Sequence, residues 1–318
     1  MIARTAAAAR NDQLTKPPGA LGRLESLALW MAEWQGRERP AIDHAQAIVF
    51  AGNHGVAAQG VSAFPPDVTI QMVANFEAGG AAINQLCASN GAALSVVPLL
   101  LDQPTEDFTQ APALGEDDLL QALATGWEAV DQTADCLLLG EMGIGNTTAA
   151  AALAAALFGG QAERWIGRGT GVDAAGLGRK CEVVAAGLAR TGDVSGDPVR
   201  AVAEFAGREM AAMMGATLRA RALRCPVLLD GFIGTAAVAP LSCIDRAALA
   251  HCQASHRSAE AAHGRLLDAL GLDPVLSLDL RLGEGSGAAL ALGIVRAALA
   301  CHNGMATFSE AAVSAQSG

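Results

Sequence analysis

The feature that most constrains the fold is a series of short apolar runs, each of which ends abruptly in a glycine-rich or polar turn. These runs lie at 45–55, 92–100, 136–148 and 225–234, with a further one at 275–287. Continuous apolar runs of this length are typical of strands that are buried on both faces of a sheet. Because segments with a helical pattern separate the runs, they predict an α/β fold, in which helices cover both faces of a parallel sheet.

The helical patterns also divide the chain. They lie at 68–88, 119–132, 147–157, 176–190, 199–221, 258–270 and 287–300. Residues 1–36 have no strand signal and predict two helices, the first of which is stopped by Pro17 and Pro18. We expect an N-terminal helical segment at 1–40, an α/β catalytic domain at 41–285 and a C-terminal helical segment at 286–318, the two terminal segments packing together as a small helical domain.

The composition argues against several classes of protein. A net charge of −11 argues against a nucleic-acid partner, because such binding depends on Lys and Arg neutralising phosphates. No apolar stretch reaches the ~18–20 residues that span a bilayer, so we expect no membrane partner. The seven cysteines include no C-x-x-C pair, and no cluster of His, Cys, Asp and Glu has metal-ligand spacing. We therefore expect a cytoplasmic protein with free thiols and no metal.

Polar residues follow the predicted strands, at the edge where open parallel sheets bind their ligands. They are Asn53 and His54, the stretch 141–148, Asp230 and Gly231, and the stretch 284–286. Strands that run in parallel bring their carboxyl ends to the same edge of the sheet. This convergence predicts a single ligand site at that edge.

Three stretches have the residues of an anion site. "GEMGIGNTTAA" (140–150) follows a strand and opens a helix, so that its backbone N–H groups can approach a ligand, but it has neither the phosphate-loop nor the dinucleotide spacing. "GRGTGVD" (167–173) and "ASHRSAEAAHG" (254–264) add glycines, hydroxyls and cations, the latter at a predicted helix start. A helix cap, a surface turn and a structural histidine are the alternative interpretations of the three.

Two glutamates stand beside glycines just beyond strands. Glu284 lies in "LRLGEGSGAALALG" (280–293), and Glu141 lies in "GEMG" (140–143). Glycines on either side let the backbone approach a small molecule closely. Paired carboxylates suit acid–base catalysis or a glycosidic reaction with a cation-like transition state. They favour an enzyme, with a non-catalytic nucleotide- or azole-binding regulatory protein on the same fold as the alternative.

Seven stretches, in this order, resemble the family of nicotinate-nucleotide–dimethylbenzimidazole phosphoribosyltransferases. They are "KPPGALGRLE" (16–25), "GNHGVAAQGVSAFPPDVTIQMVANFEAGGAAIN" (52–84), "GEMGIGNTTAAAAL" (140–153), "GRGTGVD" (167–173), "PVLLDGFIGTAA" (226–237), "SHRSAEAAH" (255–263) and "LRLGEGSGAALAL" (280–292). The resemblance implies a Rossmann-like α/β domain with a small helical domain, a homodimer and no cofactor. It also implies transfer of the phosphoribosyl group of nicotinate mononucleotide to dimethylbenzimidazole. Nicotinate and α-ribazole 5′-phosphate are then the products, with anomeric inversion, in assembly of the cobalamin nucleotide loop.

The resemblance further implies residue roles. Glu284 corresponds to the proposed general base, and Glu141 corresponds to a second glutamate near the same pocket. The implied phosphate- and ribose-binding residues are Gly143, Asn146, Thr147, Lys180, Ser258 and Gly169, and the implied base pocket contains Phe64, Met142 and Leu282. The chemistry agrees, because a pyridinium leaves as a neutral ring without a general acid, whereas the incoming azole must lose its N–H proton to a base.

Overall fold

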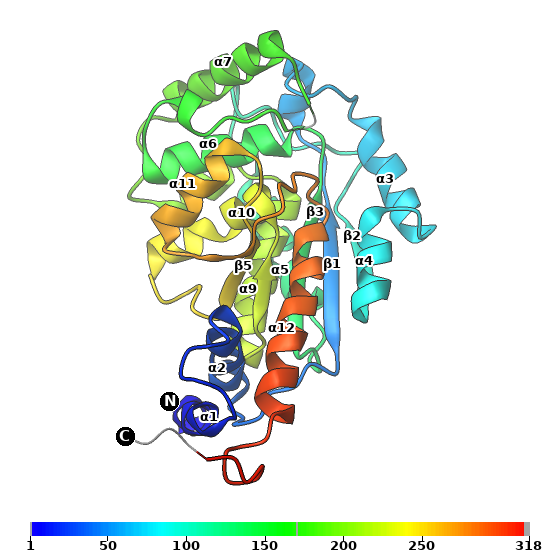
Figure 1. Cartoon of the computed structure of the whole chain (residues 1–318). Helices are drawn as coiled ribbons and strands as arrows, with labels where there is room; N and C mark the ends of the chain where they lie inside the picture. The colour runs from blue at the N-terminus through cyan, green and yellow to red at the C-terminus, as the bar shows by residue number, and fades with distance from the viewer. Residues whose placement is uncertain (1, 170, 315–318) are drawn as a thin grey trace.

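The computed structural model describes residues 2–169 and 171–314. Its centre is a six-stranded sheet in the order β2-β1-β3-β4-β5-β6, in which every neighbouring pair is parallel. The strands are β1 (Ala45–Ala51), β2 (Ala92–Pro98), β3 (Cys136–Met142), β4 (Val227–Leu229), β5 (Cys252–His256) and β6 (Pro274–Leu276). Helices lie on both sides of the sheet (Figure 1), which confirms the predicted α/β fold.

Most of the helices agree with the sequence patterns, two of which are each broken into a pair of helices. The helices are α1 (Ile2–Gln13), α2 (Arg23–Gln35), α3 (Asp67–Glu77), α4 (Ala82–Asn90), α5 (Glu116–Ala129), α6 (Asn146–Phe158), α7 (Ala174–Thr191), α8 (Pro198–Phe205), α9 (Arg208–Leu223), α10 (Gly231–Ile244), α11 (Ala261–Leu270) and α12 (Ser286–Gly304). The pattern at 68–88 forms two helices, because Gly79 adopts a φ of 78° and Asn84 accepts the N–H of Ala81 to cap α4. The pattern at 199–221 is likewise divided, because Ala206 and Gly207 are extended.

The prediction was wrong for residues 252–256. They were expected to lead into a helix, but they form β5, and α11 starts only at Ala261. The stretch "CQASH" has too few apolar residues to give a strand pattern, and its burial comes from its place between β4 and β6. The last predicted strand is also shorter than expected, because β6 ends at Leu276.

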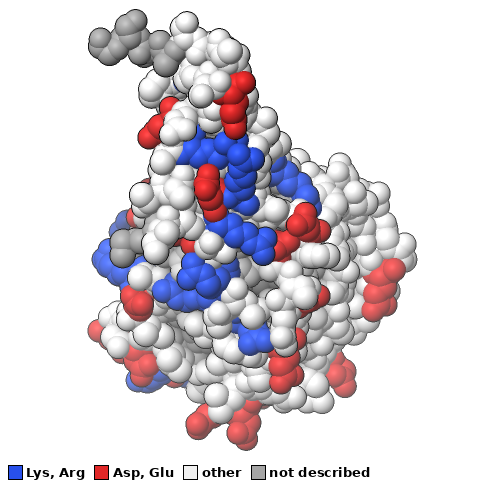
Figure 2. Space-filling view, turned by 90° about the horizontal axis from the view of Figure 1, so that it is seen from below, with Lys and Arg blue, Asp and Glu red and all other residues white. Residues whose placement is uncertain are grey.

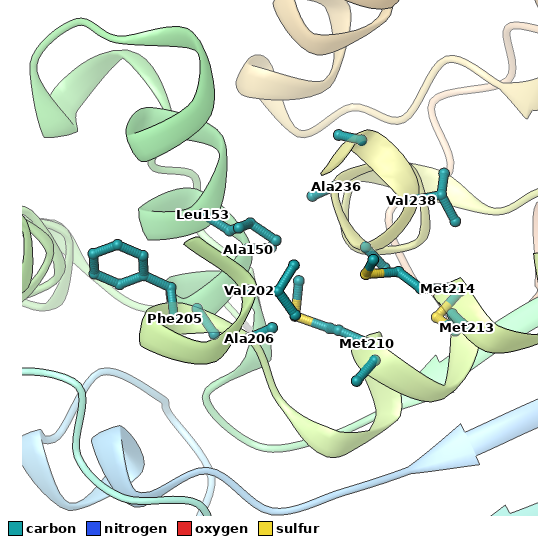
Figure 3. Packing of buried hydrophobic residues seen from close by; sticks show 14 of the residues in the cluster. Ala150, Leu153, Val202, Phe205, Ala206, Met210, Met213, Met214, Ala236 and Val238 are labelled. Atoms are coloured by element: carbon teal, nitrogen blue, oxygen red, sulfur yellow. The ribbon is translucent and has the colours of Figure 1, made fainter. Parts of the chain in front are cut away.

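Two apolar clusters fill the space on either side of the sheet. Alternate residues of β1 point to opposite faces, so that Ile48 and Phe50 join one cluster while Ala47 and Val49 join the other. The first cluster packs α6, α8, α9 and α10 through small and flexible side chains, with Val202 among those drawn in Figure 3. The second cluster packs α2, α4 and α12 on the opposite face. The loops at the carboxyl edge therefore stand on a rigid base.

The terminal segments lie together at the lower end of the molecule in Figure 1. Leu14 forms a β-bridge with Thr307, and the guanidinium of Arg10 donates to the carbonyls of His302 and Met305 at 3.0 Å. Helix α12 also packs against the sheet, since its residues share a cluster with apolar residues of β3. The division into domains at residues 40 and 285 therefore stays a prediction.

Figure 2 views the molecule from this lower end. Lys and Arg side chains gather across the middle of the face, although the chain carries a net charge of −11. The carboxyl ends of the strands lie at the other end of the molecule, so that cations for an anionic ligand there must come from residues of the site itself. None of the helices in the described residues combines the length and the apolar character needed to cross a bilayer.

Candidate active site

A cavity of about 670 Å³ opens at the carboxyl ends of the strands, within the usual size range of small-molecule sites. Its walls contain all but one of the residues selected from the sequence: Phe64, Glu141, Met142, Gly143, Asn146, Thr147, Gly169, Ser258, Leu282 and Glu284. The exception is Lys180, which lies behind Thr147. Asn53 and His54 do not line the cavity. The structure thus brings these residues to one place, while their individual roles stay predictions.

Glu141 is the next-to-last residue of β3, and its side chain is almost completely buried. The side-chain amide of Asn146, at the start of α6, donates a hydrogen bond to its carboxylate. Burial, reinforced by the nearby carboxylates of Asp230 and Glu209, raises the pKa of Glu141 to about 8. Glu141 is therefore a carboxyl group that carries a proton near neutral pH.

Glu284 lies on a tight turn between β6 and α12. Its φ is 63°, and the glycines on both sides, Gly283 and Gly285, have φ values of 84° and 83°. A residue with a side chain seldom adopts this left-handed conformation, and such strain is typical of functional sites. Burial raises the pKa of Glu284, and its Oε2 atom has no hydrogen-bond partner among the described residues. Because Glu284 lines the cavity, this buried oxygen gives its carboxylate unused hydrogen-bonding capacity next to a ligand.

Asp230, the residue after β4, completes a group of three carboxylates. It is 2% exposed and accepts hydrogen bonds from the backbone N–H groups of Gly285 at 3.1 Å and Ala288 at 3.0 Å. Burial raises the pKa of Asp230 to about 7, although the backbone N–H groups act in the opposite direction. The Nδ1 atom of His256 lies 3.5 Å from Oδ1. Sequence reasoning noted this aspartate at a strand end but did not select it as a site residue.

A cationic and hydroxyl-rich wall lies beside these carboxylates. The buried Nζ of Lys180, from α7, donates to Oγ1 of Thr147 at 3.0 Å and to the carbonyl of Gly167 at 3.3 Å. Burial lowers the pKa of Lys180 to about 8. The start of α6 and the 167–173 loop, of which Thr170 lies outside the described residues, meet at this lysine. Backbone N–H groups at a helix start, together with a lysine, are suited to bind phosphate.

Ser258 and Glu260 close this wall from the segment between β5 and α11. The backbone N–H of Ser258 donates to Nδ1 of His263 at 2.9 Å, which fixes the position of the serine. The carboxylate of Glu260 accepts the N–H of Gly169 at 2.9 Å. Glu260 was not selected from the sequence, because a glutamate in a first helical turn is an ordinary feature.

Another part of the cavity wall is apolar. Phe64, just before α3, and Leu282, just before the Glu284 turn, are 51% and 57% exposed. Met142 of β3 and Met72 of α3 extend the same wall. Large apolar side chains left open to a cavity are suited to contact a flat aromatic ligand.

A second buried pair supports the site from behind. Nε2 of His54 lies 2.7 Å from Oε1 of Glu209, and both side chains are buried. Glu209 was missed because the sequence pattern placed it in the middle of one long helix, whereas it stands in the first turn of α9. Within the ranges that the structure describes, no group of three or more His, Cys, Asp or Glu side chains is placed to hold a metal ion.

The fold and the cavity define an α/β enzyme with buried carboxylates beside an anion-binding wall, and comparison with known proteins identifies its class. A family model described as a phosphoribosyltransferase matches residues 2–313. The nicotinate-nucleotide–dimethylbenzimidazole phosphoribosyltransferase from Jannaschia sp. is 61% identical to the chain, and the alignment covers 98% of this chain and 92% of that protein. The enzyme of the same name from Roseobacter denitrificans is 63% identical, and the alignment covers 96% of this chain and 91% of that protein. The chain is therefore a phosphoribosyltransferase. It belongs to the nicotinate-nucleotide–dimethylbenzimidazole phosphoribosyltransferase family.

A solved structure agrees with this assignment. The crystal structure of CobT from Thermus thermophilus is 43% identical to the chain and superposes with a TM-score of 0.93, covering 99% of this chain and all of that one. The agreement in fold thus covers nearly the full length of the chain. The resemblance found in the sequence motifs is thereby confirmed.

Proposed function

We propose that the enzyme transfers the phosphoribosyl group of nicotinate mononucleotide to dimethylbenzimidazole. The products are nicotinate and α-ribazole 5′-phosphate, formed with inversion at the anomeric carbon, in the assembly of the cobalamin nucleotide loop. The observation that carries this proposal is a single cavity whose walls contain both Glu284, with its unpartnered carboxylate oxygen, and Thr147, to which Lys180 donates. The names of the relatives support the choice of substrates.

In the proposed reaction, Glu284 acts as the general base. Its carboxylate takes the N–H proton of the azole, and the lone pair of the other ring nitrogen attacks C1′ of the ribose. The bond from C1′ to the pyridinium nitrogen breaks, and its electron pair stays on that nitrogen, so that a neutral ring departs. The raised pKa of Glu284 makes its carboxylate a stronger base than an exposed one. Inversion follows when azole and nicotinate occupy opposite faces of the ribose.

Glu141 has a different proposed role. With a pKa of about 8 it is protonated near neutral pH, and it is already hydrogen-bonded to Asn146. A neutral carboxyl group can donate a hydrogen bond to a ribose hydroxyl without adding a second negative charge next to Glu284. We assign to Glu141 the positioning of the ribose rather than proton abstraction.

The remaining walls bind the two ends of the substrates. The phosphate and ribose are assigned to Gly143, Asn146, Thr147, Gly169, Lys180 and Ser258, which form or support the polar wall. The aromatic base is assigned to Phe64, Met142 and Leu282 on the apolar wall. The family resemblance also supports a homodimer, a cytoplasmic location and a small helical domain built from the two termini.

A nicotinate-release assay tests the proposed function. Purified enzyme is given nicotinate mononucleotide with and without dimethylbenzimidazole, and the product is examined by NMR for the configuration at C1′. We expect nicotinate release that depends on the azole, and an α-configured product. Release without the azole would indicate a hydrolase, and a folded enzyme that releases no nicotinate would refute the assignment of these substrates.

A further inference from the structure

Asp230 makes contacts that are unusual for a residue at the end of a strand. Its two carboxylate oxygens accept hydrogen bonds from different backbone groups at the start of α12, Oδ2 from Gly285 and Oδ1 from Ala288. The residue at the N-cap of α12 is Gly285, which has no side chain with which to satisfy these groups. Asp230 therefore caps α12 from a neighbouring strand, 55 residues away in sequence from Gly285.

This cap is attached to the turn that carries Glu284. Gly285, whose N–H is bound by Asp230, directly follows Glu284 in the run of left-handed residues. A non-glycine residue in this conformation is strained and persists only where its surroundings impose it. The two hydrogen bonds to Asp230 are buried, and a buried backbone N–H group that loses its acceptor destabilises the fold around it.

The absence of a side chain at Gly287 allows Asp230 to approach the start of α12 this closely. A Cβ atom on Gly287, in the first turn of α12, would lie 2.8 Å from Oδ1 of Asp230 and 2.0 Å from Nδ1 of His256. Oγ of Ser255 lies 3.1 Å from the same Nδ1 atom and fixes the histidine ring. The ends of β4 and β5 thus pack closely against the first turn of α12 at this point.

We propose that Asp230 is a positioning residue that caps the first turn of α12 and thereby holds Glu284 in the left-handed conformation needed at the cavity wall. It acts through Glu284 and does not itself take the proton. The inference rests on the proposed function of Glu284 as general base. It adds a residue outside the two glutamates, and it explains why the base stands on a strained turn.

The test replaces Asp230 by asparagine. The amide keeps one acceptor oxygen, but its NH₂ group faces the second backbone N–H, so that one of the two hydrogen bonds is lost. We expect kcat of azole-dependent nicotinate release to fall about 10²-fold, as for a displacement of a reacting group by about 1 Å. KM for nicotinate mononucleotide should change little, because the Lys180 wall is untouched. An unchanged kcat in a folded variant would overturn the proposal.

Asp197→Asn is the matched control. Asp197 caps α8, but only one of its oxygens accepts a backbone N–H, that of Arg200 at 3.0 Å. Asparagine is about as good as aspartate at such a position, so we expect no change in kcat. If Asp230→Asn does not fold, Asp230→Ser takes its place, because serine is smaller and neutral and has one oxygen in place of the two that accept from Gly285 and Ala288.

A double-mutant cycle separates positioning from general damage. In the Glu284→Gln background no base remains to be positioned, so Asp230→Asn should reduce the residual rate by less than about threefold. An equal loss in both backgrounds would show that Asp230 does not act through Glu284.

The pH profile of the Asp230→Asn variant gives a second readout. Three carboxylates raise the pKa of Glu141: those of Asp230, of Glu284 and of Glu209, which pairs with His54. Removing the charge of Asp230 should therefore lower the pKa of Glu141, so that activity is lost at a lower pH on the alkaline side of the profile.

Hydrogen exchange distinguishes failure of this inference from failure of the proposed function. Asp230→Asn should increase the exchange of backbone amides in 283–289, whatever substrates the enzyme uses, and Asp197→Asn should not. If exchange in 283–289 is faster in the variant but the enzyme releases no nicotinate, the capping role of Asp230 stands and the assignment of these substrates is refuted. Unchanged exchange would refute the cap even if the enzyme is active.

Discussion

Glu141 and Glu284 share a cavity but stand on backbones of opposite character. Glu141 belongs to a regular strand, in register with Phe50 of β1, and its carboxylate is hydrogen-bonded to Asn146. Glu284 stands on a left-handed turn, and its Oε2 atom has no hydrogen-bond partner among the described residues. A carboxyl group fixed by the sheet is suited to hold a substrate in place. One carried on a strained turn with a free oxygen is suited to exchange a proton.

The surrounding charges produce a second difference. Glu141 lies among other carboxylates, and its pKa rises to about 8, whereas burial alone raises the pKa of Glu284. Two carboxyl groups in one cavity cannot easily both be ionised, because burial and like charge act against the second charge. The environment thus favours a neutral Glu141, which agrees with the different roles proposed for the two glutamates.

Among the substitutions that test this comparison, Glu284→Gln should have the largest effect on kcat. The amide preserves the size of the side chain but cannot accept a proton. We expect kcat to fall about 10²–10⁴-fold, the usual contribution of a general base, with a smaller change in KM. Single-turnover nicotinate release measures it. Glu128→Gln, on the exposed face of α5, is the control and should leave the rate unchanged. A rate close to that of the wild type in Glu284→Gln would assign proton abstraction to Glu141 or to solvent.

Gly140→Ala tests how closely the two glutamate segments are packed. A Cβ atom on Gly140 would lie 2.5 Å from the carbonyl oxygen of Glu284, so the turn must move. We expect about a 10²-fold loss of kcat while the folded structure, checked by circular dichroism, is kept. Gly304→Ala is the control, because Gly304 ends α12 and a Cβ atom there meets nothing within 4 Å. Full activity of Gly140→Ala would show that the position of the turn is not critical.

Sequence reasoning could predict the strands and the glutamates for the same reason. Buried parallel strands give long apolar runs, and the carboxyl ends of these strands and the loops that follow them converge on one edge of the sheet. It missed β5, whose residues are buried by their neighbours and not by their own apolar pattern. It also missed the contact of Asp230 with the start of α12, because no local pattern shows that β4 and α12 approach each other. It missed Glu209 because it did not predict the helix break at Ala206 and Gly207, which places Glu209 in the first turn of α9.

The pH dependence of stability tests the claim that protons are held in the folded site. Glu141 and Asp230 have pKa values of about 8 and 7 when folded, above their ordinary values of 4.5 and 3.8. The folded state then binds more protons than the unfolded state, so the free energy of unfolding should fall as pH rises from about 5 to about 8. In Glu141→Gln the decrease should be smaller, by on the order of 1–3 kcal/mol. Urea unfolding at several pH values measures this difference, and parallel curves would contradict it.

The rate of Glu141→Gln at neutral pH should show the smallest effect. Glutamine resembles a protonated glutamate: its oxygen can accept from Asn146, and its NH₂ group can donate to the ribose in place of the carboxyl proton. We therefore expect kcat within about threefold of the wild type near pH 7, a smaller change than the loss of a typical hydrogen bond to the substrate would cause. Above about pH 8 the wild type should lose activity as Glu141 ionises, whereas the variant should keep it. Glu141→Ala, which can neither accept nor donate, is the control and should be slower at every pH. A loss in Glu141→Gln as large as that in Glu284→Gln would remove the distinction between the two glutamates, because both would then have to take part in proton transfer.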